Sequence, residues 1–180
     1  MRMAEGQPAR DFQVEDIFGN PVALKDYAGK RLMLSFYRYA SCPLCRLRIS
    51  ELIAHHPLFQ EKGLSMLVFL ESPRESILKH VGKQGIPFPI IADPKRHIYR
   101  LYGVESSWVG YARGMLRFSS IFKAFRKGFL PGKMEGEKAL LPADFLIGQD
   151  LTIQKAYYGK DIGDHLPTEE IERFLRGANQ

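Results

Sequence analysis

The sequence predicts an α/β fold, and three observations support this. Short apolar runs of strand length alternate with segments of helical spacing through the middle of the chain, in the order βαβαβ. Two alternating segments precede that stretch, and two further strands and a helix follow it. A length of 180 residues suffices for one well-packed core and is short for two, so we expect residues 1–180 to form one domain.

The N-terminal part is predicted to start with a β-hairpin. Two alternating segments flank Phe18-Gly19-Asn20-Pro21, which is a good hairpin signal. A turn at 27–30 then leads into a mostly apolar run at 32–37, whose length and composition suit a central parallel strand. After it, apolar residues at helical spacing predict a helix that starts near Pro43 and ends near His55-His56-Pro57.

The alternation continues with a strand, a helix and a short strand, at 66–70, 73–81 and 87–91. Asp93-Pro94 predicts the start of another helix, with Asp93 as N-cap and Pro94 in the first turn. The chain is predicted to close with a second hairpin and a last helix, at 143–147, 152–157 and 167–175. This order supports the α/β class.

The segment 110–133 stands apart as a predicted insertion. Large apolar residues recur there at three- and four-residue steps: Met115, Phe118, Phe122, Phe125 and Phe129. Cations occupy other positions: Arg113, Arg117, Lys123, Arg126 and Lys127. This pattern predicts a basic amphipathic helix. Its phenylalanines either pack on the sheet or on a partner in a homodimer, or the helix docks on a membrane surface or another anionic partner. We favour packing and expect no nucleic-acid partner.

Composition indicates an ordinary globular protein, with 45% hydrophobic and 26% charged residues and a net charge of +6. No apolar run approaches the roughly 20 residues that span a bilayer. Polar residues follow the first six, so the start of the sequence does not resemble a secretory signal. We therefore expect a cytoplasmic, reducing environment, in which a permanent disulfide is rare.

The two cysteines, Cys42 and Cys45, are the main candidates for chemistry. They lie between the strand that ends near Tyr37 and the helix that begins near Pro43. Free backbone N–H groups and the helix dipole favour an anion at a helix N-terminus, so the pKa of Cys42 should fall below its ordinary value of roughly 8.5. Nearby arginines add to this effect: Arg38, Arg46 and Arg48. Cys45, one turn further on, is placed to resolve a mixed disulfide or a sulfenic acid on Cys42.

Other interpretations of the cysteine pair are weaker. A bridge across so short a loop constrains the unfolded chain little, so a structural role explains the pair poorly. The nearest extra metal ligands, His55 and His56, lie about 15 Å along the same helix, and there is no second C-x-x-C. Two unreactive buried cysteines remain an alternative. We interpret the pair as redox-active and expect no metal and no cofactor.

Several motifs together resemble the alkyl hydroperoxide reductase/thiol-specific antioxidant (AhpC/TSA) family of peroxiredoxin-like proteins. The motifs are Ala9-Arg10-Asp11-Phe12, Gly19-Asn20, Leu24-Lys25-Asp26-Tyr27, Gly29-Lys30, Phe36-Tyr37, Asp93-Pro94 and Tyr102-Gly103-Val104. The resemblance covers most of the chain outside 110–133. It implies a thioredoxin-like, peroxiredoxin-type three-layer sandwich, with a central mixed sheet and an N-terminal β-hairpin. It also implies an antioxidant oxidoreductase that reduces peroxides or disulfides and is re-reduced by a thioredoxin- or glutathione-type thiol donor.

Departures from the family pattern leave the mechanism open. The positions of the family's P-x-x-x-T-x-x-C loop fall on Arg38, Cys42 and Cys45, so a cysteine replaces the threonine that orients the peroxide. The family's late-strand arginine falls at Pro142. Leu141-Pro142 resembles the cis-proline loop of thioredoxins, which lies against the active-site disulfide. We therefore include Pro142 in the site and expect a cis bond there; a trans proline that opens a strand is the alternative.

The same departures give two assignments for the attacking thiol. Comparison with thioredoxins makes Cys42 the attacker and Cys45 the resolver, whereas counting by the peroxiredoxin pattern makes Cys45 the attacker. Exposure at the helix terminus favours Cys42. Because the peroxide-orienting residues look absent, we favour dithiol exchange, with peroxide as the other substrate class. A redox sensor whose basic helix binds an anionic partner is the alternative function.

Four other residues are minor candidates for the site. Glu71 and Ser72 end a predicted central strand, at the sheet edge where open α/β sheets place ligands. Trp108 and Tyr111 could line a cleft there but are more typical of a core or rim.

Overall fold

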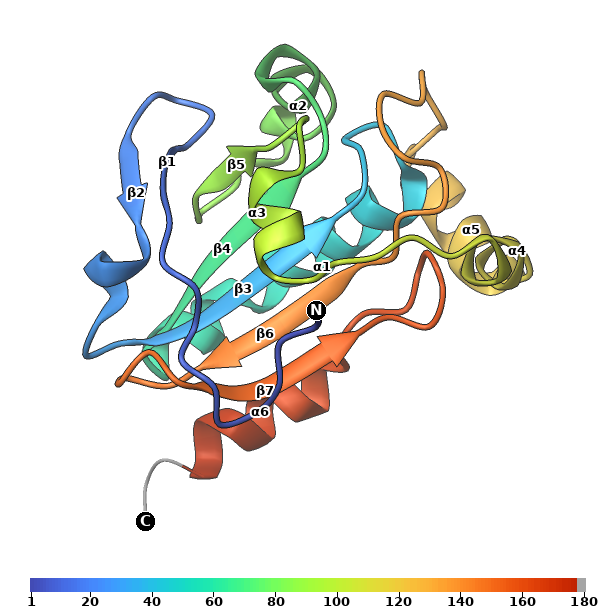
Figure 1. The fold of residues 1–180 in the computed structure, drawn as a ribbon. Helices are drawn as coiled ribbons and strands as arrows, with labels where there is room; N and C mark the ends of the chain where they lie inside the picture. Colours follow the sequence, from blue (N-terminus) through green and yellow to red (C-terminus); the bar gives the residue numbers. More distant parts are fainter. Residues whose placement is uncertain (178–180) are drawn as a thin grey trace.

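The computed structural model of the chain describes residues 1–177 and has a five-stranded mixed sheet at its centre (Figure 1). The strand β3 (Arg31–Tyr37) lies in the middle, parallel to β4 (Leu64–Leu70) and antiparallel to β6 (Ala143–Ile147). Outside them lie β5 (Ile90–Ala92), parallel to β4, and β7 (Ile153–Tyr158), antiparallel to β6. The predicted α/β class and mixed sheet are confirmed.

The predicted N-terminal hairpin is also confirmed. The strand β1 (Gln13–Glu15) pairs antiparallel with β2 (Pro21–Ala23) in a separate two-stranded sheet. The Asp16 carboxylate holds the turn, because it accepts hydrogen bonds from the backbone N–H groups of Phe18 and Asn20 and from the Asn20 side chain. A short 3-10 helix, η1 (Leu24–Tyr27), then leads toward β3.

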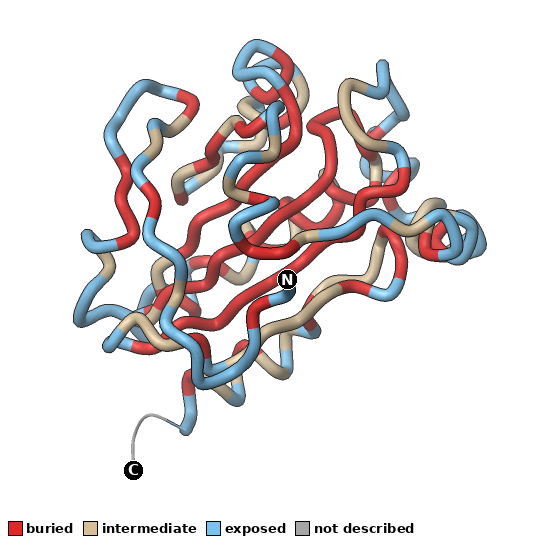
Figure 2. The backbone as a smooth tube through the Cα atoms, in the orientation of Figure 1, coloured by how far each residue is buried: buried red, intermediate tan, exposed pale blue. Residues whose placement is uncertain are grey.

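Alternating side chains of the central strands supply two cores, one on each face of the sheet. On one face, Met33 and Tyr37 of β3 pack with the helices α1 (Pro43–Glu61), α2 (Arg74–His80) and α6 (Thr168–Arg176). On the other face, the intervening residues of β3 pack with α3 (His97–Leu101), the N-terminal segment and the hairpin: Leu32, Leu34 and Phe36. Figure 2 shows the buried sheet between these two layers. The molecule is therefore a three-layer sandwich.

Two predicted helix boundaries are wrong. Helix α1 continues past Pro57 to Glu61, although a proline there removes one backbone hydrogen bond. Phe59 is fully buried on the following turn, and this packing offsets the loss. Helix α3 begins at His97, not at Pro94. The N-cap residue is Arg96, not Asp93 as predicted. The Asp93 carboxylate nevertheless accepts hydrogen bonds from the N–H groups of His97 and Ile98 at 2.9 and 2.8 Å.

The insertion forms two short helices, not the single amphipathic helix that was predicted. The first is α4 (Trp108–Met115) and the second is α5 (Phe118–Arg126). The chain bends between them, where Arg117 pairs with Asp161 at 2.8 Å and with Asp164 at 3.3 Å. These two acids lie in the loop after β7, so a contact between distant parts of the sequence accompanies the break.

Helix α5 packs on α1 through Ala124, which is buried in a small cluster with Leu47. Phe129, just after the helix, completes that cluster. Phe118 and Phe122 instead stay 71% and 63% exposed, so the prediction that they pack on the sheet is wrong within this chain. Within residues 1–177, no helix combines the length and apolar character that crossing a membrane requires.

We expect Gly114→Ala to destabilise the protein by about 1–3 kcal/mol. A Cβ at this position would lie 2.1 Å from Cγ1 and 3.1 Å from the backbone nitrogen of Ile162, so α4 could no longer lie against the loop after β7. Urea unfolding measures the change. The control is Gly82→Ala, whose Cβ would meet its nearest neighbour, Leu78, at an ordinary 3.6 Å. Equal losses in the two variants would contradict the argument.

Candidate active site

The two cysteines lie where the central strand passes into the longest helix. Strand β3 ends at Tyr37, a four-residue loop follows, and Cys42 is the N-cap residue of α1. Pro43 occupies the first helical position, where its missing N–H costs no hydrogen bond. Two hydrogen bonds hold the loop: the Ala40 N–H donates to Ser72 Oγ at 2.9 Å, and Ser41 Oγ donates to the Lys133 carbonyl at 2.6 Å.

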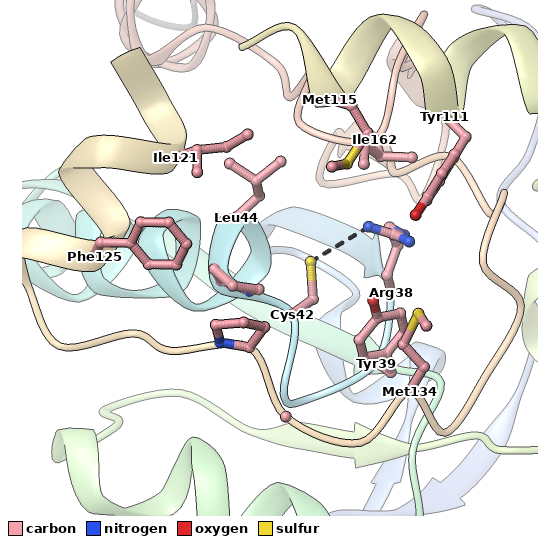
Figure 3. Close-up of a pocket in the computed structure, with 13 residues that line it drawn as sticks. Arg38, Tyr39, Cys42, Leu44, Tyr111, Met115, Ile121, Phe125, Met134 and Ile162 are labelled. Atoms are coloured by element: carbon pink, nitrogen blue, oxygen red, sulfur yellow. Dashed lines mark hydrogen bonds between the residues drawn. The ribbon is translucent and has the colours of Figure 1, made fainter. Parts of the chain in front are cut away.

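A buried arginine faces the first cysteine (Figure 3). Arg38 Nη1 donates to Cys42 Sγ at 3.4 Å, and Arg38 Nη2 donates to the Lys138 carbonyl. The guanidinium also lies 4.9 Å from the ring centre of Tyr39 and 5.8 Å from that of Tyr111. Because Arg38 is only 2% exposed, its charge acts on the sulfur with little screening by water.

The two thiols are shifted in opposite directions. The Cys45 thiol, which donates a hydrogen bond to the Cys42 sulfur, is the largest cause that lowers the pKa of Cys42, to about 6. Burial opposes this, while the Arg38 charge and the backbone N–H groups of Leu44 and Cys45 lower the pKa further. Burial raises the pKa of Cys45, and its role as donor to Cys42 raises it again. The two shifts therefore favour a thiolate on Cys42 and a protonated thiol on Cys45.

A cavity of about 260 Å³ opens next to Cys42. Its walls come from the start of α1, from α4 and α5 of the insertion, and from the loop at 131–134 (Figure 3). Most of the wall comes from apolar or aromatic side chains: Leu44, Tyr111, Met115, Ile121, Phe125, Met134 and Ile162. Among residues 1–177, Arg38 is the only Lys, Arg, Asp or Glu in the lining. Cys45 does not line the cavity. Both thiols are buried, at 2% and 1% exposure, so the expectation that Cys42 is the exposed thiol is wrong. Cys42 is nevertheless the thiol that a ligand in the cavity reaches first.

Pro142 lies beside this site but not in the cavity. It is buried at the start of β6, and its carbonyl accepts a hydrogen bond from the Gly159 N–H at 2.9 Å. No peptide bond is cis within residues 1–177, so the expected cis bond at Pro142 is wrong. The preceding Leu141 packs in the same core cluster as both cysteines. Pro142 is thus a buried trans proline directly before β6, which matches the alternative interpretation of this residue.

The minor candidates have different outcomes. Tyr111 lines the cavity, while Trp108 is 66% exposed away from it. Ser72 holds the cysteine loop through Ala40, as described above. Glu71 is buried behind that loop, where it pairs with Arg96 at 3.2 Å and accepts from the Glu137 N–H, and burial raises its pKa. Trp108, Ser72 and Glu71 do not line the cavity.

Apart from Tyr111, sequence reasoning missed the part of the cavity wall that the insertion contributes. The loop at 131–134 approaches the cysteine loop closely, because a Cβ on Gly132 would lie 2.8 Å from Cβ of Ser41. No short motif signals this contact, since the two segments are about ninety residues apart. Within the described part of the chain, no three His, Cys, Asp or Glu side chains converge as metal ligands.

Comparison with known sequences gives a consistent picture. The model of the AhpC/TSA family matches residues 5–156. A Mycobacterium tuberculosis protein named as a peroxiredoxin is 29% identical over 119 residues, which cover 64% of this chain and 76% of that protein. The thiol-disulfide oxidoreductase ResA of Geobacillus thermodenitrificans is 30% identical over 103 residues, which cover 57% of this chain and 59% of ResA.

Comparison with solved structures supports the fold. Peroxidoxin BcpB from Mycobacterium tuberculosis superposes with a TM-score of 0.71 and 16% identity, covering 99% of this chain and 100% of BcpB. A mutant of PrxQ from Xylella fastidiosa gives 0.70 and 17% identity, covering 99% of this chain and 96% of PrxQ. At these identities the likeness shows the fold alone, and that fold is the expected thioredoxin-like, peroxiredoxin-type sandwich.

Proposed function

Because this chain belongs to the AhpC/TSA family of peroxiredoxins and thiol-disulfide oxidoreductases, we propose that it reduces hydroperoxides through a Cys42–Cys45 dithiol cycle. One observation carries the proposal: the Arg38 guanidinium lies 3.4 Å from the Cys42 sulfur at a small, mostly apolar cavity. The remaining support comes from the opposite pKa shifts of the two thiols.

The proposed cycle consists of attack on the peroxide, formation of the disulfide and reduction of that disulfide by a thiol donor. The Cys42 thiolate attacks the terminal oxygen of the hydroperoxide, so an S–O bond forms, the O–O bond breaks, and the alkoxide takes a proton to leave as an alcohol. Cys42 is then a sulfenic acid. The Cys45 sulfur attacks it, loses its proton and releases water as the disulfide forms. A thioredoxin- or glutathione-type donor then reduces the disulfide by thiol exchange and is itself oxidised.

The surroundings of Cys42 favour a small substrate that carries oxygen. Cys42 is only 2% exposed and lines a cavity of about 260 Å³, a volume that suits a small substrate. The Nε of Arg38 is buried and has no hydrogen-bond partner among the described residues. The Arg38 guanidinium, whose Nη1 lies 3.4 Å from the Cys42 sulfur, is suited to stabilise charge that develops on the departing oxygen. In this chain Pro142 occupies the position of the family's late-strand arginine. Arg38 thus supplies a guanidinium from a different place in the sequence.

Disulfide reduction is the second candidate function. The C-x-x-C spacing and the split between a Cys42 thiolate and a Cys45 thiol suit thiol–disulfide exchange. In that case Cys42 attacks one sulfur of the substrate, the other sulfur leaves as a thiol, and Cys45 resolves the mixed disulfide.

We keep the prediction that the protein works in a reducing, cytoplasmic environment.

We expect the wild type to consume cumene hydroperoxide over many turnovers in the presence of excess dithiol, and to reduce insulin disulfides much more slowly. The measurement is loss of peroxide and precipitation of insulin under the same donor. Many turnovers would also exclude a sensor that oxidises once. Rapid insulin reduction without peroxide loss would reject the peroxidase proposal and leave disulfide exchange.

A further inference from the structure

The insertion carries six large exposed apolar side chains, which we together call the apolar face. Its members come from α4, from α5 and from the loop that follows: Trp108, Leu116, Phe118, Phe122, Phe125 and Leu130. All are at least 43% exposed, and Phe118 reaches 71%. Figure 2 shows both helices exposed at one side of the molecule, away from the sheet. Single exposed apolar residues are ordinary, but a cluster of large ones marks an interaction surface.

The apolar face is part of a regular amphipathic pattern. In α5, Phe118, Phe122 and Phe125 follow steps of four and three, so they lie on one side of the helix. Ala124, on another side, is fully buried against α1. Helix α5 therefore already packs on α1 through Ala124, and its three phenylalanines remain available to contact a partner.

The insertion's own charged residues have a single sign. Residues 108–134 contain six Lys or Arg and no Asp or Glu. Arg117 is neutralised by Asp161, and Lys123 by Glu51. Within residues 1–177, Arg113, Arg126 and Lys133 form no ion pair. The surface thus combines large apolar side chains with uncompensated positive charge.

We propose that α4 and α5 dock this protein on an anionic lipid surface. The apolar face would enter the boundary between headgroups and acyl chains, and the cations would contact the anionic headgroups. The protein would lie on the bilayer, because within residues 1–177 no helix could span it. A symmetric dimer through the same face fits less well, since it would place the cations of one copy against those of the other.

Docking in this way would bring the active-site cavity to the lipid. Met115, Phe125 and Met134 line the cavity and are also 48%, 43% and 45% exposed, so the cavity wall continues into the apolar face. A docked molecule would then draw apolar substrate from the bilayer. This consequence rests on the proposed function, whereas the docking itself does not.

The test is co-sedimentation of the full chain with vesicles of phosphatidylcholine, with and without one third phosphatidylglycerol. We expect binding to the anionic vesicles, weakened by salt, and about tenfold or more weaker binding after Arg113→Glu with Arg126→Glu. Phe118→Ser with Phe122→Ser should weaken it similarly. These four residues are exposed, so the urea midpoint of each variant should match the wild type.

Matched controls alter the same chemistry elsewhere. Phe18→Ser removes a 65% exposed phenylalanine from the N-terminal hairpin, and Lys25→Glu with Lys83→Glu reverses two exposed cations outside the insertion. Both should bind vesicles like the wild type. Cys42→Ser should also bind, which separates docking from redox activity. Binding that ignores phosphatidylglycerol, or that the controls weaken equally, would overturn the proposal. So would a dimer broken by Phe118→Ser with Phe122→Ser in a protein that binds no vesicles.

Discussion

Replacing Cys42 with serine should abolish turnover of peroxide and of disulfide substrates, by about a thousandfold or more. Only the thiolate form attacks, and Cys42 is the sulfur that lines the cavity and has its pKa lowered to about 6. A serine hydroxyl at the same place stays protonated at neutral pH and is a poor nucleophile. The measurement is steady-state peroxide consumption with excess donor.

Cys45→Ser should behave differently and serves as the matched control. Its Cys42 thiolate should still react once, and the product should persist because no second thiol resolves it. A sulfenic-acid trap such as dimedone should label Cys42 after peroxide, and a disulfide substrate should leave a mixed disulfide. If Cys45→Ser lost the first attack while Cys42→Ser kept it, the attacking role would pass to Cys45, as counting by the peroxiredoxin pattern suggested.

Arg38→Met should raise the pKa of Cys42 from about 6 toward its ordinary value of roughly 8.5. The Arg38 charge favours the thiolate and lowers the pKa of Cys42, whereas burial favours the neutral thiol and raises it. Without Arg38, the effect of burial is less opposed. In the wild type, the rate of alkylation by iodoacetamide should rise with pH up to about 6 and then level off. In the variant the rise should continue to higher pH. At pH 7 the alkylation rate should be about threefold lower than in the wild type, because the hydrogen bond from Cys45 remains.

Two further variants keep this prediction specific. Arg46→Met removes another arginine from the first turn of α1, one that contacts Leu130 and Phe129 and not the sulfur, so it should leave the alkylation profile unchanged. Cys45→Ala removes the thiol that donates to Cys42 and should raise the pKa of Cys42 as well. An Arg38→Met profile that coincides with the wild type would show that the guanidinium does not hold the thiolate.

Arg38→Met also removes the donor to the Lys138 carbonyl, so the variant has a structural cost. Urea unfolding measures that cost separately from the pKa. Arg38→Lys keeps the positive charge while losing the forked guanidinium geometry. If this variant restores the low pKa but not peroxide turnover, charge sets the thiolate and the guanidinium donors act on the substrate, as we propose.

Local patterns alone determined the centre of this protein. The apolar run up to Tyr37, the proline at position 43 and the cysteines beside it predicted a strand, a loop and a helix N-terminus, which the structure confirms. These features depend on neighbouring residues: a strand needs its apolar run, and a helix start needs a cap and tolerates proline. The lowered pKa of Cys42 follows from that same short segment, because Arg38, Cys45 and the first N–H groups of α1 all belong to it.

The tertiary structure decided the substrate cavity and its exposed surroundings. Periodicity showed that the insertion has an apolar side, but not that Arg117 would pair with Asp161 and split it into two helices. It also could not show that Ala124, and not the phenylalanines, would face α1. The sequence also did not show that Pro142 would be trans and would lie outside the cavity. Each outcome depends on contacts between residues far apart in the sequence, and a local pattern carries no information about which distant residue will fill the space beside it.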